Sequence, residues 1–439
     1  MNRSQKKRAE KFMRILDQAH GEIKKAAKRG EKAVVLELLG QCQAGSIELG
    51  TAIEAEEGEG FVTVRLLENY CEILYRLYEK IRLDEPVNAE KEEKNLQKAR
   101  IRIENSVRND IIAKKEVVFL PYKASMWDSL ESVWKAADED PDCRAYVIPI
   151  PYYDRREDGS FGDMHYEGDR YPDYVPVTGY GDYDFEGRQP DAIFIHNPYD
   201  ECNYVTSVHP FFYSKNLKKF TERLVYIPYF IIKDEVPEHY CMLPGVIHAD
   251  KIYVHSERAA EVYRENLSKF MNGKEMRRKI VGIGSPKMDR VREYETDGAG
   301  IPEPWKDLLS HAEERKIILY NTHLNGLMAV NERVTIEKIK NTLAWFQNRK
   351  DLLLWWRPHP LSLATVRAMN PGAEGRYVEI VEKYKAEAWG IYDDTEDLNR
   401  AIAFADAYFG DTSSVVLLFK QTGKPILLQN RRVGQEIRA

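Results

Sequence analysis

From Glu116 onward, short apolar runs alternate with helical patterns, and this alternation constrains the fold more than any other feature of the chain. The runs are long enough for strands and almost continuously apolar: VVFLPY, AYVIPI, DAIFIHN, RLVYIPYF, DKIYVHS and KIVGIG. Strands that are buried on both faces and separated by helices are typical of a doubly wound parallel sheet. The alternation therefore predicts an α/β fold.

The alternation breaks once, over residues 291–314, which contain DGAG and two prolines. It resumes with the runs IILY, LLLWW, AYFG and PILL. We interpret 291–314 as a linker between two Rossmann-like domains, 116–290 and 315–439. Residues 151–190, rich in Tyr, Asp, Gly and Pro, interrupt the first domain. Such a long insertion is usually functional, and a surface loop folded down on the domain is the alternative.

The first 112 residues have a different composition and predict an all-helical segment, either a helical hairpin or a small bundle. Pro86 is their only proline, and residues 62–81 carry apolar side chains at helical spacing. Residues 1–32 hold eleven basic and four acidic side chains, a local net charge of +7. A basic helix of this kind could lie on an anionic membrane surface, but a solvated helix face is the simpler interpretation.

The overall composition excludes several classes of protein. Lys and Arg number 65 against 71 Asp and Glu, a net charge of -6, so we expect no nucleic-acid partner. No run reaches eighteen apolar residues, and no apolar stretch follows the basic start as in a secretory signal. The five cysteines are scattered, which favours a reducing compartment. These features predict a cytoplasmic protein, with peripheral attachment to the inner membrane face as an option through the basic helix.

Polar residues cluster directly after three predicted strands of the second domain. Ligands of open α/β sheets bind beyond the carboxyl ends of the strands, so these residues should form one site. They are Asn321, Thr322 and His323 after IILY, Arg357 and His359 after LLLWW, and Asp411, Thr412, Ser413 and Ser414 after AYFG. Thr412 or Ser413 would cap a helix whose free amides attract an anion. Arg357 offers a planar fork for phosphate oxygens, and His359 can donate to a phosphate or move a proton.

Each of these features also has a structural interpretation, as a plain helix cap, a surface ion pair or a structural histidine. Their coincidence at successive strand ends favours a nucleotide diphosphate. The sequence has no Walker A motif, no complete dinucleotide fingerprint and no paired-histidine metal spacing. We therefore expect no metal and no cofactor.

The C-terminal half resembles the CDP-glycerol glycerophosphotransferase family, which is similar to teichoic acid primases and polymerases. The resemblance covers about residues 190–430, with RPHP at 357–360 and DTSS at 411–414 as its most specific parts; GSPKMD at 284–289 also fits. It implies a GT-B fold of two Rossmann domains. It also implies transfer of glycerol phosphate from a CDP-linked donor to a polyol-phosphate or lipid-linked acceptor, with release of CMP.

Mapped onto this chain, the resemblance implies that six residues cradle the donor diphosphate and its glycerol phosphate: Arg357, His359, Asp411, Thr412, Ser413 and Ser414. His359 would assist the departure of CMP while an acceptor hydroxyl attacks in line. The family's first domain carries a W-H-G motif whose histidine is the expected base. Here Tyr229 and Phe230 stand at the tryptophan and histidine positions, and neither is a base near neutral pH.

Three other residues could replace the missing base: His209, His196 and Glu235. We take His209 as a catalytic candidate, with His196, Tyr229 and Glu235 on the acceptor side. The basic C-terminal extension typical of the family is absent, which predicts a truncated or unusual end. Two alternatives stay open: a GT-B glycosyltransferase that uses another nucleotide-sugar donor, and a non-catalytic nucleotide-binding or scaffold protein.

Overall fold

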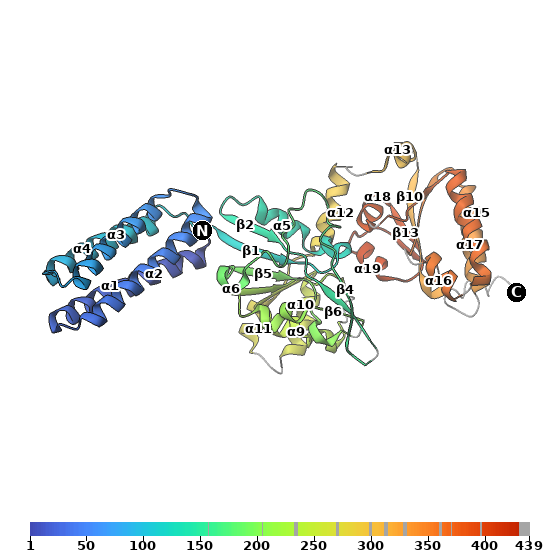
Figure 1. Ribbon diagram of the computed structural model, residues 1–439. Coiled ribbons are helices and arrows are strands. Elements are labelled where there is room, and N and C mark those ends of the chain that lie inside the picture. Colours follow the sequence, from blue (N-terminus) through green and yellow to red (C-terminus); the bar gives the residue numbers. More distant parts are fainter. Residues whose placement is uncertain are drawn as a thin grey trace.

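The computed structural model describes residues 1–156, 158–203, 205–231, 236–268, 272–297, 301–310, 315–327, 332–359, 362–369, 371–395 and 397–429. A helical segment, a first parallel sheet and a second parallel sheet follow one another along the chain and along the length of the molecule (Figure 1). The predicted fold class is confirmed: an α/β protein with a GT-B-like pair of Rossmann-like domains preceded by an all-helical segment.

Four long helices form the N-terminal segment: α1 (Arg3–Arg29), α2 (Lys32–Glu57), α3 (Val62–Arg82) and α4 (Ala89–Asn109). Each helix packs against the next, and α4 packs against α1, so the four enclose a common apolar core. A capping box at Asn2 and Gln5 begins α1, and Gly30, at φ +73°, ends it in a conformation that side chains rarely adopt. Met13 and Leu74 are fully buried in the core.

The basic charge of α1 is partly neutralised within this bundle. Lys24 pairs with Glu93 at 2.5 Å and Lys28 pairs with Glu90 at 3.2 Å, both across to α4. Solvent-accessible pairs of this kind contribute little to stability, but they neutralise charge that an anionic membrane surface would otherwise attract. Among the described helices, none is long and apolar enough to cross a membrane.

The first sheet is parallel throughout, in the order β2-β1-β5-β7-β8-β9. Its strands are β1 (Lys115–Leu120), β2 (Cys143–Val147), β5 (Ala192–Ile195), β7 (Arg223–Tyr226), β8 (Lys251–Val254) and β9 (Ile280–Gly282). Leu120 packs into the core on one face, whereas Phe119 packs into the core on the other. Burial on both faces explains why the runs are apolar along almost their whole length.

Short helices connect these strands. They are η1 (Ala124–Ser129), α5 (Glu131–Asp138), α6 (Phe185–Arg188), η2 (Asp200–Cys202), η3 (Pro210–Phe212), α7 (Ser214–Leu217), α8 (Glu238–Cys241), α9 (Pro244–His248), α10 (Glu257–Leu267) and α11 (Gly273–Lys279). Ser256 caps α10 by accepting the Ala259 amide at 3.1 Å.

The 151–190 insertion folds onto the first domain. Within it β3 (Tyr152–Arg155) and β4 (Phe161–His165) form an antiparallel hairpin that pairs with β6 (Thr206–Val208). Farther along, Tyr171 packs edge-on against Trp127 of η1, and Tyr174 stacks on Trp134 of α5. The segment is therefore folded down on the first domain.

The second sheet is also parallel, in the order β12-β11-β10-β13-β14. Its strands are β10 (Lys316–Thr322), β11 (Leu352–Pro358), β12 (Ile391–Tyr392), β13 (Ala407–Gly410) and β14 (Ile426–Leu428). The helices around it are α14 (Leu324–Leu327), α15 (Glu332–Gln347), α16 (Ser362–Met369), η5 (Pro371–Ala373), α17 (Glu374–Glu387), α18 (Leu398–Phe404) and α19 (Ser414–Lys420). Trp355 and Trp356 are fully buried in cores on opposite faces.

Two helices lie between the sheets: α12 (Pro286–Asp297) and α13 (Glu303–Ser310). The segment 291–314, expected as a linker, thus includes part of α12 and all of α13. Asp128, in the segment after β1, joins the two halves here. Its carboxylate pairs with Lys287 of α12 at 2.5 Å and accepts a hydrogen bond from Asn399 of α18 at 2.9 Å.

Candidate functional site

The carboxyl ends of β10, β11 and β13 lie side by side in the second sheet. Asn321 of β10 is in register with Arg357 of β11 and with Gly410 of β13. The Asn321 side chain ties the ends together, because its Nδ2 donates to the Arg357 carbonyl oxygen at 3.1 Å and its Oδ1 accepts from the Ser413 hydroxyl at 3.0 Å. The residues predicted to form one site are therefore neighbours.

Gly410 permits this close approach. Its φ is +142°, and a Cβ at this position would lie 2.2 Å from the Asn321 carbonyl oxygen. We expect Gly410→Ala to shift Asn321 and to lower the free energy of unfolding by about 1–3 kcal/mol, as overpacking does. The matched control is Gly375→Ala in α17, where no atom lies within 4 Å of the new Cβ. Equal urea midpoints for the two variants would contradict the prediction.

His323 and His359 meet at this edge. Their ring centroids are 5.7 Å apart with the rings nearly perpendicular, at 82°. The His359 amide donates to the Thr322 carbonyl oxygen at 3.0 Å, which fixes the backbone beyond β11. Burial, and secondly the neighbouring His323, lower the pKa of His359. A neutral imidazole keeps one N–H and one lone pair. His359 can therefore donate a hydrogen bond to a phosphate or accept a proton.

The 411–414 segment divides into structural and exposed groups. Asp411 accepts the His323 amide at 2.9 Å and pairs with Lys338 of α15 at 2.5 Å. Its carboxylate therefore shapes the site, and as an anion it would repel a phosphate unless Lys338 balanced its charge. Thr412 and Ser414 are exposed beside it.

The predicted cap of α19 does not form. Ser413 occupies the cap position, but its hydroxyl bonds Asn321 and no side chain caps the helix. The first amides of a helix have no intrahelical partner, so the start of α19 keeps donors for an incoming ligand.

Arg357 and Thr322 are already engaged by the protein. The Arg357 guanidinium lies 2.8 Å from the Asp393 carboxylate and donates to the Thr395 carbonyl oxygen at 2.6 Å. The side chain of Arg357 is 7% exposed and that of Asp393 is fully buried. The fork predicted to bind phosphate is thus occupied by a buried ion pair. The Thr322 hydroxyl likewise accepts the indole N–H of Trp356, at 3.2 Å.

His196 lies buried at the carboxyl end of β5. Its Nε2 accepts the Tyr122 amide at 3.2 Å, so Nδ1 carries the proton and donates to the Ser129 hydroxyl at 2.9 Å. Burial, and secondly the charge of Lys287, lower the pKa of His196 to about 3. Both ring nitrogens are used, and the structure places His196 as a support for the segment after β1.

The other first-domain candidates are separated. His209 follows β6, and its Nδ1 accepts the Phe211 amide at 3.2 Å. Tyr229 follows β7 and packs against the ring of His196, with ring centroids 5.9 Å apart. Burial raises the pKa of Tyr229, which moves it further from use as a base. Glu235 lies outside the described residues.

Sequence reasoning missed two charged groups beside the second-domain site. Lys338 lies in the middle of α15, where nothing in the local sequence separates it from an ordinary surface lysine. Asp393 follows β12, and the register that pairs Trp356 with Tyr392 places it opposite Arg357. A signal for Asp393 existed in the run IYDD, where acidic residues directly follow an apolar pair.

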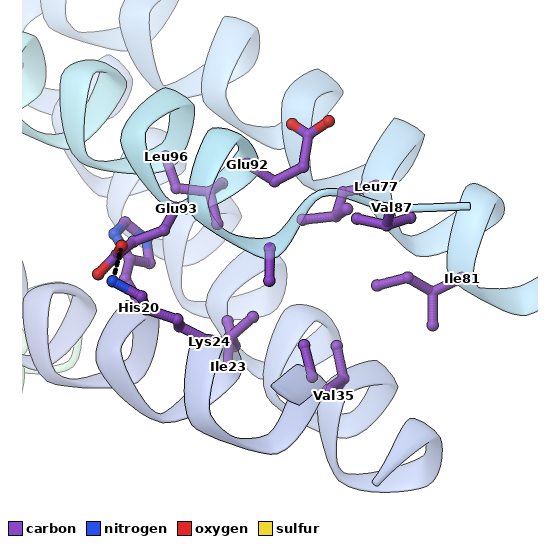
Figure 2. Close-up of a pocket in the computed structure, with 12 residues that line it drawn as sticks. His20, Ile23, Lys24, Val35, Leu77, Ile81, Val87, Glu92, Glu93 and Leu96 are labelled. Atoms are coloured by element: carbon purple, nitrogen blue, oxygen red, sulfur yellow. Dashed lines mark ion pairs between the residues drawn. The ribbon is translucent and has the colours of Figure 1, made fainter. Parts of the chain in front are cut away.

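Two hollows in the protein lie away from the strand ends. One lies inside the helical bundle beside His20, Ile23 and Leu96, with the Lys24–Glu93 ion pair at its edge (Figure 2). Its volume of about 20 Å³ leaves room for one water and not for a substrate. The other is a surface hollow over α11, lined by Gly273, Lys274, Arg277 and Arg278. In the part of the chain that the structure describes, no cluster of three or more potential metal ligands occurs.

Comparison with known proteins adds fold neighbours. No model of a known protein family matches the sequence, and no curated protein matches it. The wall teichoic acid polymerase TagF is 13% identical over 84% of this chain and 80% of that chain, with a TM-score of 0.42. UDP-GlcNAc 2-epimerase from Neisseria meningitidis, bound to UDP-GlcNAc, is 9% identical over 73% and 85%, with a TM-score of 0.43. MnaA of S. aureus with UDP is 12% identical over 73% and 82%, with a TM-score of 0.41. These structures share little sequence with this chain, and their likeness to it concerns the fold.

Proposed function

We propose that the chain is a transferase that moves glycerol phosphate from a CDP-linked donor to a polyol-phosphate or lipid-linked acceptor, as in teichoic-acid-like polymer synthesis. The observation that carries the proposal is the convergence of His323, His359 and the 411–414 segment at three neighbouring strand ends. Two of these strand ends carry the RPHP and DTSS motifs on which the family resemblance depends.

The chemistry of this edge suits a diphosphate. The exposed hydroxyls of Thr412 and Ser414 and the uncapped start of α19 supply donors, and His359 supplies a neutral N–H at the neighbouring strand end. Lys338 offsets the Asp411 carboxylate, so the site need not repel an anion. As the bond to CMP breaks, negative charge grows on the bridging oxygen, and a positioned N–H stabilises that charge.

Calorimetry with CMP and CDP-glycerol tests the donor. We expect both to bind the full-length protein with dissociation constants of about 1 μM to 1 mM, the range usual for enzyme substrates. Thr412→Val should weaken binding, whereas Thr422→Val, after α19 and away from the strand ends, should not. Binding of UDP without CMP would replace this proposal with a glycosyltransferase that uses another nucleotide-sugar donor. No binding of either nucleotide would contradict both.

A further inference from the structure

One face of the β3–β4 hairpin holds a histidine–aspartate pair that has no part in the donor site of the proposed function. Tyr152 is in register with His165, and Asp154, two residues along β3, projects to the same face. The Nε2 of His165 lies 2.8 Å from the Asp154 carboxylate. The His165 ring also stacks on Tyr152, with centroids 5.1 Å apart and the planes 26° from parallel. Both contacts fix the orientation of the imidazole.

These contacts also fix the tautomer of His165. An ionised carboxylate only accepts, so Nε2 carries the proton and Nδ1 keeps its lone pair. The side chains of His165 and Asp154 are 41% and 51% exposed, and within the described residues Nδ1 of His165 has no hydrogen-bond partner. A histidine with one nitrogen held by a carboxylate and the other open to an incoming hydroxyl has the arrangement of a general base.

The hairpin face adjoins the carboxyl edge of the first sheet. The Lys123 ammonium, just beyond β1, lies over the rings of Tyr122 and Tyr152, at 5.6 and 5.1 Å from their centroids. Glu167 links the hairpin to the same segment, because it accepts from the Tyr152 hydroxyl at 2.7 Å and from the Ala124 amide at 2.8 Å. Among the described residues Lys123 has no ion-pair partner, so its charge is available to an anion.

This edge also faces the second domain. The segment after β1 runs from Lys123 to Asp128, whose carboxylate bonds Lys287 and Asn399 at the junction between the halves. Figure 1 shows β4 and β6 at the end of the first sheet that is nearer α19. An acceptor bound against Lys123 would therefore lie between the hairpin and the donor edge.

We propose that His165 is the general base for the acceptor hydroxyl, with Asp154 as its positioning residue and Lys123 as the group that binds the acceptor's phosphate. This assignment rests on the proposed function. The hydroxyl proton passes to Nδ1 of His165, and the hydroxyl oxygen forms a bond to the phosphorus of the glycerol phosphate. The bond from that phosphorus to the bridging oxygen breaks, and CMP leaves with the electron pair. His165 then releases the proton to solvent.

The other histidines considered for this role have their lone pairs engaged. The lone pair of His196 accepts the Tyr122 amide, and that of His209 accepts the Phe211 amide. The insertion hairpin thus supplies a base in a domain where the family's expected histidine position holds Phe230.

Transfer from CDP-glycerol to a synthetic diglycerol phosphate tests the assignment in the full-length protein. We expect His165→Asn to lower kcat on the order of 100-fold, the usual contribution of a general base, without changing CMP affinity by calorimetry. Added imidazole should restore part of the activity of His165→Ala. Asp154→Asn should lower kcat with unchanged KM for both substrates, and Lys123→Met should raise KM for the acceptor roughly tenfold.

The matched control is His248→Asn, since His248 ends α9 before β8, at the edge of the sheet opposite the strand ends. This variant should keep wild-type turnover. If the wild-type protein transfers glycerol phosphate and His165→Asn does so at the same rate, His165 is not the general base, while the proposed function stands. No transfer by wild type from CDP-glycerol, with no CMP binding, would overturn the proposed function and this assignment with it.

Discussion

Under the proposed function, replacing His359 by alanine is expected to lower the rate of glycerol phosphate transfer by about 100- to 1000-fold while the fold is retained. His359 stands at the meeting point of three strand ends beside His323, and in the proposed reaction its imidazole would donate to the charge that develops on the departing CMP. Its amide bonds the Thr322 carbonyl oxygen at 3.0 Å. Truncating the side chain leaves this backbone bond in place, and circular dichroism checks that the fold is retained.

The variant His359→Asn separates two roles for this side chain. Asparagine keeps an N–H donor but cannot exchange a proton near neutral pH. Partial activity in His359→Asn would indicate hydrogen-bond donation to the leaving group, whereas loss equal to that of His359→Ala would indicate proton transfer. The measurement is single-turnover release of CMP, with circular dichroism as the check on folding. Full turnover in His359→Ala would contradict a catalytic role for His359, whereas no detectable turnover of any donor by the wild-type protein would favour the scaffold alternative.

The positions of the second-domain residues could be predicted because parallel strands end at one edge of a sheet. Apolar runs fixed where β10, β11 and β13 end, and the polar residues after them had to converge. The ion-pair and hydrogen-bond partners of these side chains could not be predicted in the same way. The partner of Arg357 is Asp393, which follows β12, a strand of only two residues, Ile391–Tyr392. So short a strand has no periodicity to reveal it.

The contacts of the first-domain candidates were harder to predict, for a different physical reason. His196 does follow a strand as predicted, but its partners Tyr122 and Ser129 come from another segment, and only three-dimensional contact shows that both ring nitrogens are occupied. The pairing of His165 with Asp154 was hidden inside a Tyr- and Gly-rich stretch whose composition is typical of a loop. Hairpin register, not composition, brings those two residues together.

Arg188, whose side chain is 19% exposed, joins the helical bundle to the first sheet. The Nε of Arg188 donates to Glu116 of β1 at 2.8 Å, and its Nη1 pairs with Glu56 of α2 at 2.5 Å. Glu116 is 1% exposed and also accepts from the Tyr183 hydroxyl at 2.6 Å and from the Asn2 amide group at 3.2 Å. Arg188 is therefore the ion-pair partner of the buried Glu116, and it shares Glu56 with Arg144 of β2, whose Nη1 lies 2.7 Å from the Glu56 carboxylate.

Replacing Arg188 by methionine is expected to lower the free energy of unfolding by about 3–5 kcal/mol, because it leaves the buried Glu116 carboxylate without its cation. The double variant Glu116→Gln with Arg188→Met should recover part of this loss, since no uncompensated charge remains. The matched control is Arg82→Met, which removes a solvent-accessible pair with Glu79 and should leave the unfolding midpoint almost unchanged. Urea unfolding, with hydrogen exchange of the β1 amides, measures all three. If Arg188→Met and Arg82→Met shift the unfolding midpoint equally, Arg188 does not hold the bundle to the sheet through its charge.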